Sequence, residues 1–180
     1  LLNVGRLSEH KAQHVLIAAC ARLKAAGVAF TCDIIGEGER REALAAQIAQ
    51  EGLSDVVHLL GPRYHDEILA SYRHYHLFVL TSVVEGMPLV LMEAMNAGVP
   101  IVTTAVGAIP ELVGDTALLV PPNAPEAVAE AILRVVRGEV DLQQLTAAAH
   151  ERLRTHFDLH RNLARFAQWL TAPPTAHVPD

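Results

Sequence analysis

The sequence has few cysteines, no long apolar run and no excess of positive charge. Each of these absences excludes a class of protein. Cys20 and Cys32 have no CxxC spacing and are too few for a disulfide framework. No stretch reaches the roughly 18 to 20 consecutive apolar residues of a transmembrane helix, and none has the pattern of a signal peptide. We therefore expect a cytoplasmic protein with reduced thiols. Both cysteines are interpreted as core residues, Cys20 on one helical stripe with Leu16 and Leu23.

The charge balance is acidic, with 14 Lys and Arg against 20 Asp and Glu and a formal net charge of -6. Proteins that wrap nucleic acid usually present a basic face, so we expect no nucleic-acid partner, and any phosphate site must be local. No stretch is basic and amphipathic enough to indicate a membrane surface. His10 and His14 stand four apart, but solvation at a helix end explains them, so we expect neither a metal nor a cofactor.

Short apolar runs rich in branched residues alternate with longer segments of helical period. Continuous apolar strands that are each followed by a helix predict an α/β fold with a doubly wound, Rossmann-like parallel sheet, covered on both faces. Strands are expected over 2–5, 30–35, 56–60, 77–80, 101–103 and 117–120, and helices over 10–26, 39–51, 66–74, 89–97 and 125–137. After residue 141 we expect only helices, ending near residue 170.

The two ends of the sequence bear on domain organisation. A strand-like segment at residue 1 with no Met before it suggests a domain excised from a longer protein. Residues 173–180 contain three prolines and little to bury, so we predict that they are disordered or a cloning remnant. The expected domain is therefore 1–172, and its length is enough for one core without disulfide or metal support.

Ligands of such sheets bind beyond the carboxyl ends of the strands, so the loops there are the candidate site. The first loop carries Gly5, Arg6 and Lys11, with Ser8 as a candidate N-cap. A guanidinium, an ammonium and free amides at a helix start suit a diphosphate. The alternative is that Arg6 and Lys11 are solvated surface cations.

The second loop, with Gly36 and Gly38, suggests a dinucleotide fingerprint but does not complete it. The third glycine of GxGxxG is replaced by Arg41, and the fingerprint belongs after the first strand. Two glycines still allow the backbone to approach a ligand closely, although an ordinary turn is the simpler alternative. A nicotinamide oxidoreductase is therefore not indicated.

The fourth strand leads into a segment with two carboxylates, Glu85 before the next helix and Glu93 inside it. Pro88 suits the first position of that helix. Carboxylates accept strong hydrogen bonds from vicinal hydroxyls such as those of sugars and riboses. Glu85 could instead be a solvated loop residue, whereas Glu93 interrupts an apolar series and, if buried, needs a partner.

A glycine-bearing loop from Gly107 to Glu111 follows the fifth strand, so four loops are expected to converge on one crevice. Glu111 is interpreted as an acceptor of hydrogen bonds from a neighbouring loop rather than as a ligand contact. A phosphate would repel the carboxylates. The predicted site therefore works only if Arg6, Lys11 and the helix-end amides bind the phosphates, while the glutamates bind the sugar and ribose rings.

Taken together, these motifs resemble the C-terminal, donor-binding domain of group 1 (family 4) glycosyltransferases, which are retaining enzymes of the GT-B fold with an E-x7-E signature. The resemblance extends over roughly residues 1–170 in the family's order. It is carried by Val4-Gly5-Arg6-Leu7 with Lys11, Gly36-Glu37-Gly38, Leu59-Leu60-Gly61, Glu85-Gly86-Met87-Pro88-Leu89 to Glu93-Ala94-Met95, Gly98-Val99-Pro100 and Gly107 to Glu111.

The resemblance implies a role for each matching residue in binding a nucleoside diphosphate sugar, of UDP or GDP type. It assigns Arg6 and Lys11 to the diphosphate, Glu93 to the ribose and Glu85 to the transferred sugar. The remaining implied contacts are Gly5 and Leu89 in the pocket, Gly86, Met87 and Pro88 at the sugar, and Gly36, Gly38, Leu60 and Gly61 near the base.

The implied reaction transfers the sugar to an acceptor hydroxyl with retention and without a metal. Arg6 and Lys11 would stabilise the leaving phosphate, and Glu85 would contact the sugar rather than act as the nucleophile. The family's N-terminal, acceptor-binding domain is absent from this chain, so we expect the chain alone to transfer little. The alternative is a non-catalytic module that binds a nucleotide or a protein. Membrane association of the complete enzyme is left open.

Two positions depart from the pattern of many relatives, because Ala12 and Ala108 stand where those relatives have glycine. An alanine at a close-approach or positive-φ position would shift the local backbone. We therefore expect the contacts of these two loops to differ more from the family than those of the segment from Glu85 to Glu93.

Overall fold

The structure is a computed structural model that describes residues 1–171, and the predicted disordered tail, 173–180, lies outside the described residues. Helices and strands alternate along the chain as the sequence predicts. Their order is β1 (Leu2–Val4), the 3-10 helix η1 (Glu9–Lys11), α1 (Gln13–Ala25), β2 (Cys32–Ile35), α2 (Arg41–Gln50), β3 (Val57–Gly61), α3 (His65–Ser71), the 3-10 helix η2 (Tyr72–His74), β4 (Phe78–Leu80), α4 (Leu89–Asn96), β5 (Ile101–Thr104), α5 (Ile109–Val113), β6 (Leu118–Val120), α6 (Pro125–Val136), α7 (Leu142–His156) and α8 (Leu159–Thr171).

The six strands form one parallel sheet in the order β3-β2-β1-β4-β5-β6. The chain runs outward from β1 to β3 and then returns to place β4 on the other side of β1. All strands therefore point their carboxyl ends the same way, and the order reverses between β1 and β4. Such a switch point opens a crevice above the sheet, which is where these folds bind ligands. The predicted doubly wound α/β fold is confirmed.

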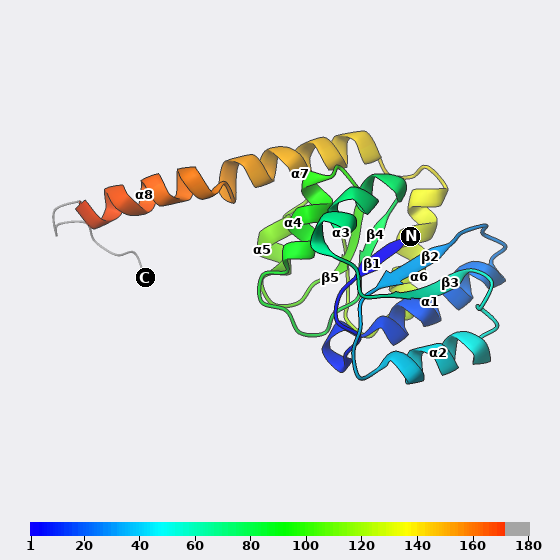
Figure 1. Cartoon of the computed structure of the whole chain (residues 1–180). Helices are drawn as coiled ribbons and strands as arrows, with labels where there is room; N and C mark the ends of the chain where they lie inside the picture. The colour runs from blue at the N-terminus through cyan, green and yellow to red at the C-terminus, as the bar shows by residue number, and fades with distance from the viewer. Residues whose placement is uncertain (172–180) are drawn as a thin grey trace.

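Helices cover both faces of the sheet, with α1, α2 and α6 on one face and α3, α4 and α7 on the other (Figure 1). Alternate strand residues supply the two cores, because side chains of a strand point to opposite faces. In β4, Val79 belongs to the first core, and Phe78 and Leu80 belong to the second. Burial of each such side chain stabilises the fold by about 1.5–3 kcal/mol.

The two cysteines lie in the first core, as predicted, and both are fully buried. Leu16 and Leu23, on the same stripe of α1 as Cys20, are also fully buried. A hydrogen bond with Cys32, together with burial, raises the pKa of the Cys20 thiol far above its ordinary value. Because the thiolate is the reactive form, Cys20 serves packing rather than chemistry. Cys32 is equally buried and packs in the same core.

Several element boundaries differ from the sequence prediction by a few residues. The first helix begins at Gln13 rather than near residue 10, because Ala12 adopts a left-handed conformation, with φ of 48°, between η1 and α1. The second strand begins at Cys32 rather than near residue 30. The expected loop from Gly107 to Glu111 contains the short helix α5, which is too brief to show a helical period in sequence.

The last two helices, α7 and α8, follow residue 141 as predicted, and α8 extends away from the body of the domain (Figure 1). None of its side chains is buried. Its large apolar side chains, Leu159, Leu163, Phe166, Trp169 and Leu170, are all exposed. Within residues 1–171, every helix is too short or too polar to cross a membrane.

Candidate active site

Backbone hydrogen bonds join the loops at the carboxyl ends of the strands. The Leu7 amide donates to the Glu37 carbonyl at 2.9 Å, which joins the loops after β1 and β2. The Val83 amide donates to the His10 carbonyl at 2.8 Å, which joins the loops after β1 and β4. The Ala108 amide reaches the Gly86 carbonyl at 3.3 Å, which joins the loops after β4 and β5. The predicted convergence of four loops is therefore confirmed.

The glycines of the second loop allow it to press against the first. A Cβ on Gly36 would lie 1.9 Å from the Gly5 carbonyl oxygen, and one on Gly38 would lie 2.3 Å from that of Leu7. The Gly36 amide also donates to the Gly61 carbonyl at 2.9 Å, which places the turn after β3 beside the same loop. These glycines are thus required for loop against loop contact, whatever ligand the site binds.

The two alanine departures behave differently from each other. Ala12 keeps a left-handed backbone, at a cost of about 1–2 kcal/mol for a residue with a Cβ. Ala108 has an ordinary φ of -85°, so it does not occupy a positive-φ position. The demanding position is Gly107, with φ of 53°, where a Cβ would lie 1.9 Å from the Glu85 carbonyl oxygen.

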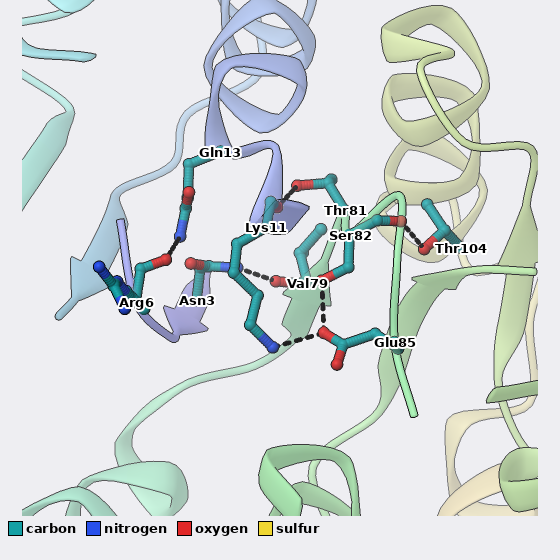
Figure 2. Close-up of polar contacts among 9 residues, drawn as sticks. All are labelled: Asn3, Arg6, Lys11, Gln13, Val79, Thr81, Ser82, Glu85 and Thr104. Atoms are coloured by element: carbon teal, nitrogen blue, oxygen red, sulfur yellow. Dashed lines mark hydrogen bonds and ion pairs between the residues drawn. The ribbon is translucent and has the colours of Figure 1, made fainter. Parts of the chain in front are cut away.

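Lys11 and Glu85 form an ion pair between the loops that follow β1 and β4 (Figure 2). The Lys11 Nζ lies 2.5 Å from Glu85 Oε1, and the Ser82 hydroxyl donates to the same oxygen at 2.6 Å. Only 8% of the Glu85 side chain and 23% of the Lys11 side chain are exposed. The interpretation of both residues as solvated surface charges is therefore wrong. Within residues 1–171, Glu85 Oε2 accepts no hydrogen bond from the protein.

Buried polar side chains hold the backbone on which this pair is mounted (Figure 2). The Thr81 hydroxyl donates to the Ala12 carbonyl at 3.0 Å, and the Thr104 hydroxyl donates to the Ser82 carbonyl at 2.6 Å. The Asn3 amide donates to the Val79 carbonyl at 2.7 Å and so braces β1 against β4. Sequence reasoning missed all of these residues, and the only signal was small polar residues at the ends of apolar strands.

The Arg6 guanidinium does not join the Lys11 and Glu85 pair. Its Nη2 lies 3.2 Å from Glu39 Oε2, and 74% of the Arg6 side chain is exposed. In this structure Arg6 is therefore a solvated cation, which is the alternative that the spacing left open. Exposed pairs of this kind contribute about 0–1 kcal/mol, so the guanidinium is free to exchange its partner at little cost. Its backbone is fixed, because the Gln13 side-chain amide donates to the Arg6 carbonyl at 2.9 Å.

Glu93 lies on α4, and 18% of its side chain is exposed. Its expected need for a partner is confirmed, because the Tyr72 hydroxyl lies 3.0 Å from Glu93 Oε2. His65 Nδ1 lies 3.8 Å from the other carboxylate oxygen. Burial, and then the charge of Glu93, raises the pKa of the Tyr72 phenol far above its ordinary value, so the phenol keeps its proton as a donor. Sequence reasoning found neither Tyr72 nor His65.

Two helix starts differ from expectation. Pro88 is the N-cap of α4 and not its first helical residue, because its ψ of 113° is extended and α4 begins at Leu89. Ser8 precedes η1 but makes no side-chain capping bond. Met87, Leu89 and Leu60 are exposed at this end of the sheet, although Leu60 only barely so.

Glu111 is held by its backbone rather than by its carboxylate. The Arg152 guanidinium donates to the carbonyl oxygens of Glu111 at 2.6 Å and Leu112 at 2.8 Å. The prediction that the Glu111 carboxylate accepts bonds from a neighbouring loop is therefore wrong. The donor comes instead from α7, a contact of residues far apart in sequence. Within residues 1–171, no three His, Cys, Asp or Glu side chains gather in a way that could hold a metal ion.

A family profile described as "Glycosyl transferases group 1" matches residues 1–152. The chain belongs to this family. It is 37% identical to a putative colanic acid biosynthesis glycosyltransferase of Salmonella typhimurium over 93% of this chain and 44% of the relative. It is 35% identical to an amylovoran biosynthesis glycosyltransferase of Erwinia amylovora, covering 94% of this chain and 44% of the relative.

The solved structures agree with the family assignment. Anabaena HepE in complex with UDP superposes with a TM-score of 0.84 and 26% identity, covering 94% of this chain and 48% of HepE. Sucrose-phosphate synthase from Thermosynechococcus elongatus gives a TM-score of 0.82 and 25% identity, covering 94% of this chain and 44% of the synthase. The fold is therefore that of the matching part of these two solved structures. The chain spans less than half the length of the relatives described above.

Proposed function

We propose that this chain is the donor-binding domain of a retaining glycosyltransferase that moves a sugar from a nucleoside diphosphate sugar to an acceptor hydroxyl. The observation that carries the proposal is the buried pair of Lys11 and Glu85 at the switch point of the sheet. A cation and a carboxylate, both withdrawn from water, are suited to hold a phosphate on one side and a sugar hydroxyl on the other.

In this proposal, the donor diphosphate competes with Glu85 for the Lys11 ammonium. Arg6 leaves its exposed partner Glu39 and joins Lys11 at the phosphates. Both cations then stabilise the negative charge that develops on the leaving phosphate. We expect the two cations to replace a metal ion in this role. We therefore propose that the reaction needs neither a metal nor another cofactor.

Glu85 is proposed to bind the transferred sugar through its free oxygen, Oε2. Its other oxygen already accepts from Lys11 and Ser82, and two such donors lower the nucleophilicity of a carboxylate. This favours a binding role over attack on the anomeric carbon. Glu93 is proposed to hold the ribose, and the backbone from Gly86 to Pro88 lies beside the sugar. Gly36, Gly38 and the turn at Leu60 and Gly61 are proposed to lie near the base.

UDP is the first nucleotide to test, because HepE has been solved with UDP and with UDP-glucose; GDP is the second. We propose that the half of the relatives not matched by this chain supplies the acceptor site, and that this chain alone transfers little sugar. The acceptor would then be set by residues outside this chain.

A titration of the isotope-labelled chain with UDP, GDP and ADP tests the donor site by NMR. We expect resonances from Gly5 to Lys11 and from Glu85 to Glu93 to shift with one of these nucleotides. A flat titration at millimolar ligand would contradict the proposal. Sugar transfer is then measured on the complete protein with the matching sugar donors. Binding without transfer or donor hydrolysis would favour a non-catalytic module instead.

A further inference from the structure

A buried phenol supports the Glu93 carboxylate from inside the domain. Tyr72, in η2, is fully buried, and its ring packs against Phe78 with the ring centroids 5.6 Å apart. Its hydroxyl lies 3.0 Å from Glu93 Oε2 and 3.2 Å from the Val90 carbonyl oxygen. A phenol has a single proton, and a carboxylate is the stronger acceptor of the two. The Tyr72 hydroxyl therefore donates mainly to Glu93 rather than to the Val90 carbonyl.

The two oxygens of Glu93 have unequal surroundings. Oε2 accepts from Tyr72, whereas Oε1 faces His65 Nδ1 at 3.8 Å, which is too long for a hydrogen bond. The His65 side chain is mostly exposed, so it places little constraint on Oε1. Among residues 1–171, no side chain or amide donates to Oε1. The carboxylate is thus fixed through one oxygen and open through the other.

We infer that Tyr72 is a positioning residue for the nucleotide: it holds Glu93 in one rotamer, so that Oε1 is presented to the ribose hydroxyls. This inference rests on the proposed function, in which Glu93 binds the ribose. A free glutamate on a helix surface samples several rotamers and must be ordered when a ligand binds. Tyr72 orders it in advance, and the loss of that order weakens ribose binding without altering the reacting atoms.

The alternative is that Tyr72 serves stability alone, because a buried hydroxyl needs an acceptor and Val90 offers one. The two roles differ in what happens to the nucleotide. A purely structural phenol would change the melting temperature but not the affinity for ribose. A positioning phenol changes the affinity only for ligands that carry ribose hydroxyls.

The test measures nucleotide binding to the complete protein by calorimetry, with Tyr72→Phe, which keeps the ring and removes the hydroxyl. Whichever of UDP, GDP and ADP binds best is compared with its 2′,3′-dideoxy analogue. We expect Tyr72→Phe to weaken the ribonucleotide about tenfold and to leave the dideoxy analogue unchanged. In transfer assays, the donor KM should rise by a similar factor, with kcat nearly constant.

Tyr75→Phe is the matched control, because the Tyr75 hydroxyl also donates to a carboxylate, Asp33 Oδ2, at 2.7 Å. We expect that variant to lose stability and to keep full nucleotide affinity. Should Tyr72→Phe not fold, 3-fluorotyrosine placed at position 72 supplies the second measurement, because it keeps the ring and makes the phenol a stronger donor to Glu93. It should change the affinity for the ribonucleotide and leave that for the dideoxy analogue unchanged.

Equal losses for the ribonucleotide and its dideoxy analogue, or no loss for either, would overturn the role of Tyr72. A wild-type protein that binds none of the three nucleotides would instead overturn the proposed function itself. The two failures are therefore distinguished by the wild-type titration.

Discussion

The two glutamates that flank the start of α4 are held in contrasting ways. Glu85 lies in a loop and is neutralised by the Lys11 ammonium, with Ser82 donating to the same oxygen. Glu93 lies on the helix and accepts from an uncharged phenol. In the proposed function, Glu85 therefore occupies the cation that the donor phosphate would bind, whereas the partner of Glu93 is not a phosphate ligand. If the proposed roles hold, the two carboxylates should respond in opposite ways to the same nucleotide.

Removal of the cation is expected to have the largest effect. Lys11→Ala leaves the nearly buried Glu85 without its counter-charge and removes a phosphate ligand, so we expect kcat to fall by about 10²–10³. The control is Lys24→Ala, which breaks an exposed pair with Asp55 that spans 2.6 Å. That variant should keep full activity. Equal activities of the two variants in a transfer assay would contradict the role of Lys11.

The next largest effect is expected from the loop that supports Glu85. Gly107→Ala places a Cβ 1.9 Å from the Glu85 carbonyl oxygen, so we expect the free energy of unfolding to fall by about 2–4 kcal/mol and the Glu85 loop to move. Gly138→Ala is the control, because Gly138 also has positive φ but nothing lies within 4 Å of its Cβ position. It should cost only about 1–2 kcal/mol in urea denaturation. Similar losses in both variants would show that the contact with Glu85 is unimportant.

A smaller effect is expected from Ser82, which shares Glu85 Oε1 with Lys11. Ser82→Ala removes a bond of 2.6 Å to a carboxylate and leaves the ion pair in place. We expect transfer to fall about tenfold, since one charge-assisted hydrogen bond contributes about 1.5–3 kcal/mol and Lys11 retains part of the orientation. Nucleotide binding should stay as in the wild type. A loss of UDP affinity instead of turnover would place Ser82 on the nucleotide rather than the sugar.

Local patterns in the sequence predict most of this fold. Apolar runs such as Phe78 to Leu80 identify strands without any knowledge of their partners, and the direction of a parallel sheet then gathers the loops at one edge. The start of α1 was harder to predict from the sequence, because it depends on Ala12 adopting a strained left-handed backbone. Nothing in local propensity predicts an alanine there.

The sequence predicted which loops carry the candidate site, but not which side chains pair with each other there. Sequence spacing brought Glu85 and Glu93 to the crevice, yet the contact between Lys11 and Glu85 joins residues 74 positions apart. The contact between Tyr72 and Glu93 joins two helices that pack only in the folded chain. Such partners are set by tertiary packing, which no period of the sequence encodes. The same holds for Arg6, because its pairing with Glu39 and its 74% exposure are visible only in the folded chain.

The most direct test of the contrast is the affinity of the complete protein for UDP without a sugar, measured for the wild type, Glu85→Gln and Glu93→Gln. Glu85→Gln frees Lys11 and removes a negative charge beside the phosphates, so UDP should bind as tightly as to the wild type or more tightly. Glu93→Gln replaces the charged carboxylate with an amide, whose acceptor oxygen is weaker and whose other terminal atom is a donor, so UDP should bind about tenfold more weakly. Equal weakening in both variants would contradict the account, because it would mean that the two carboxylates play the same part.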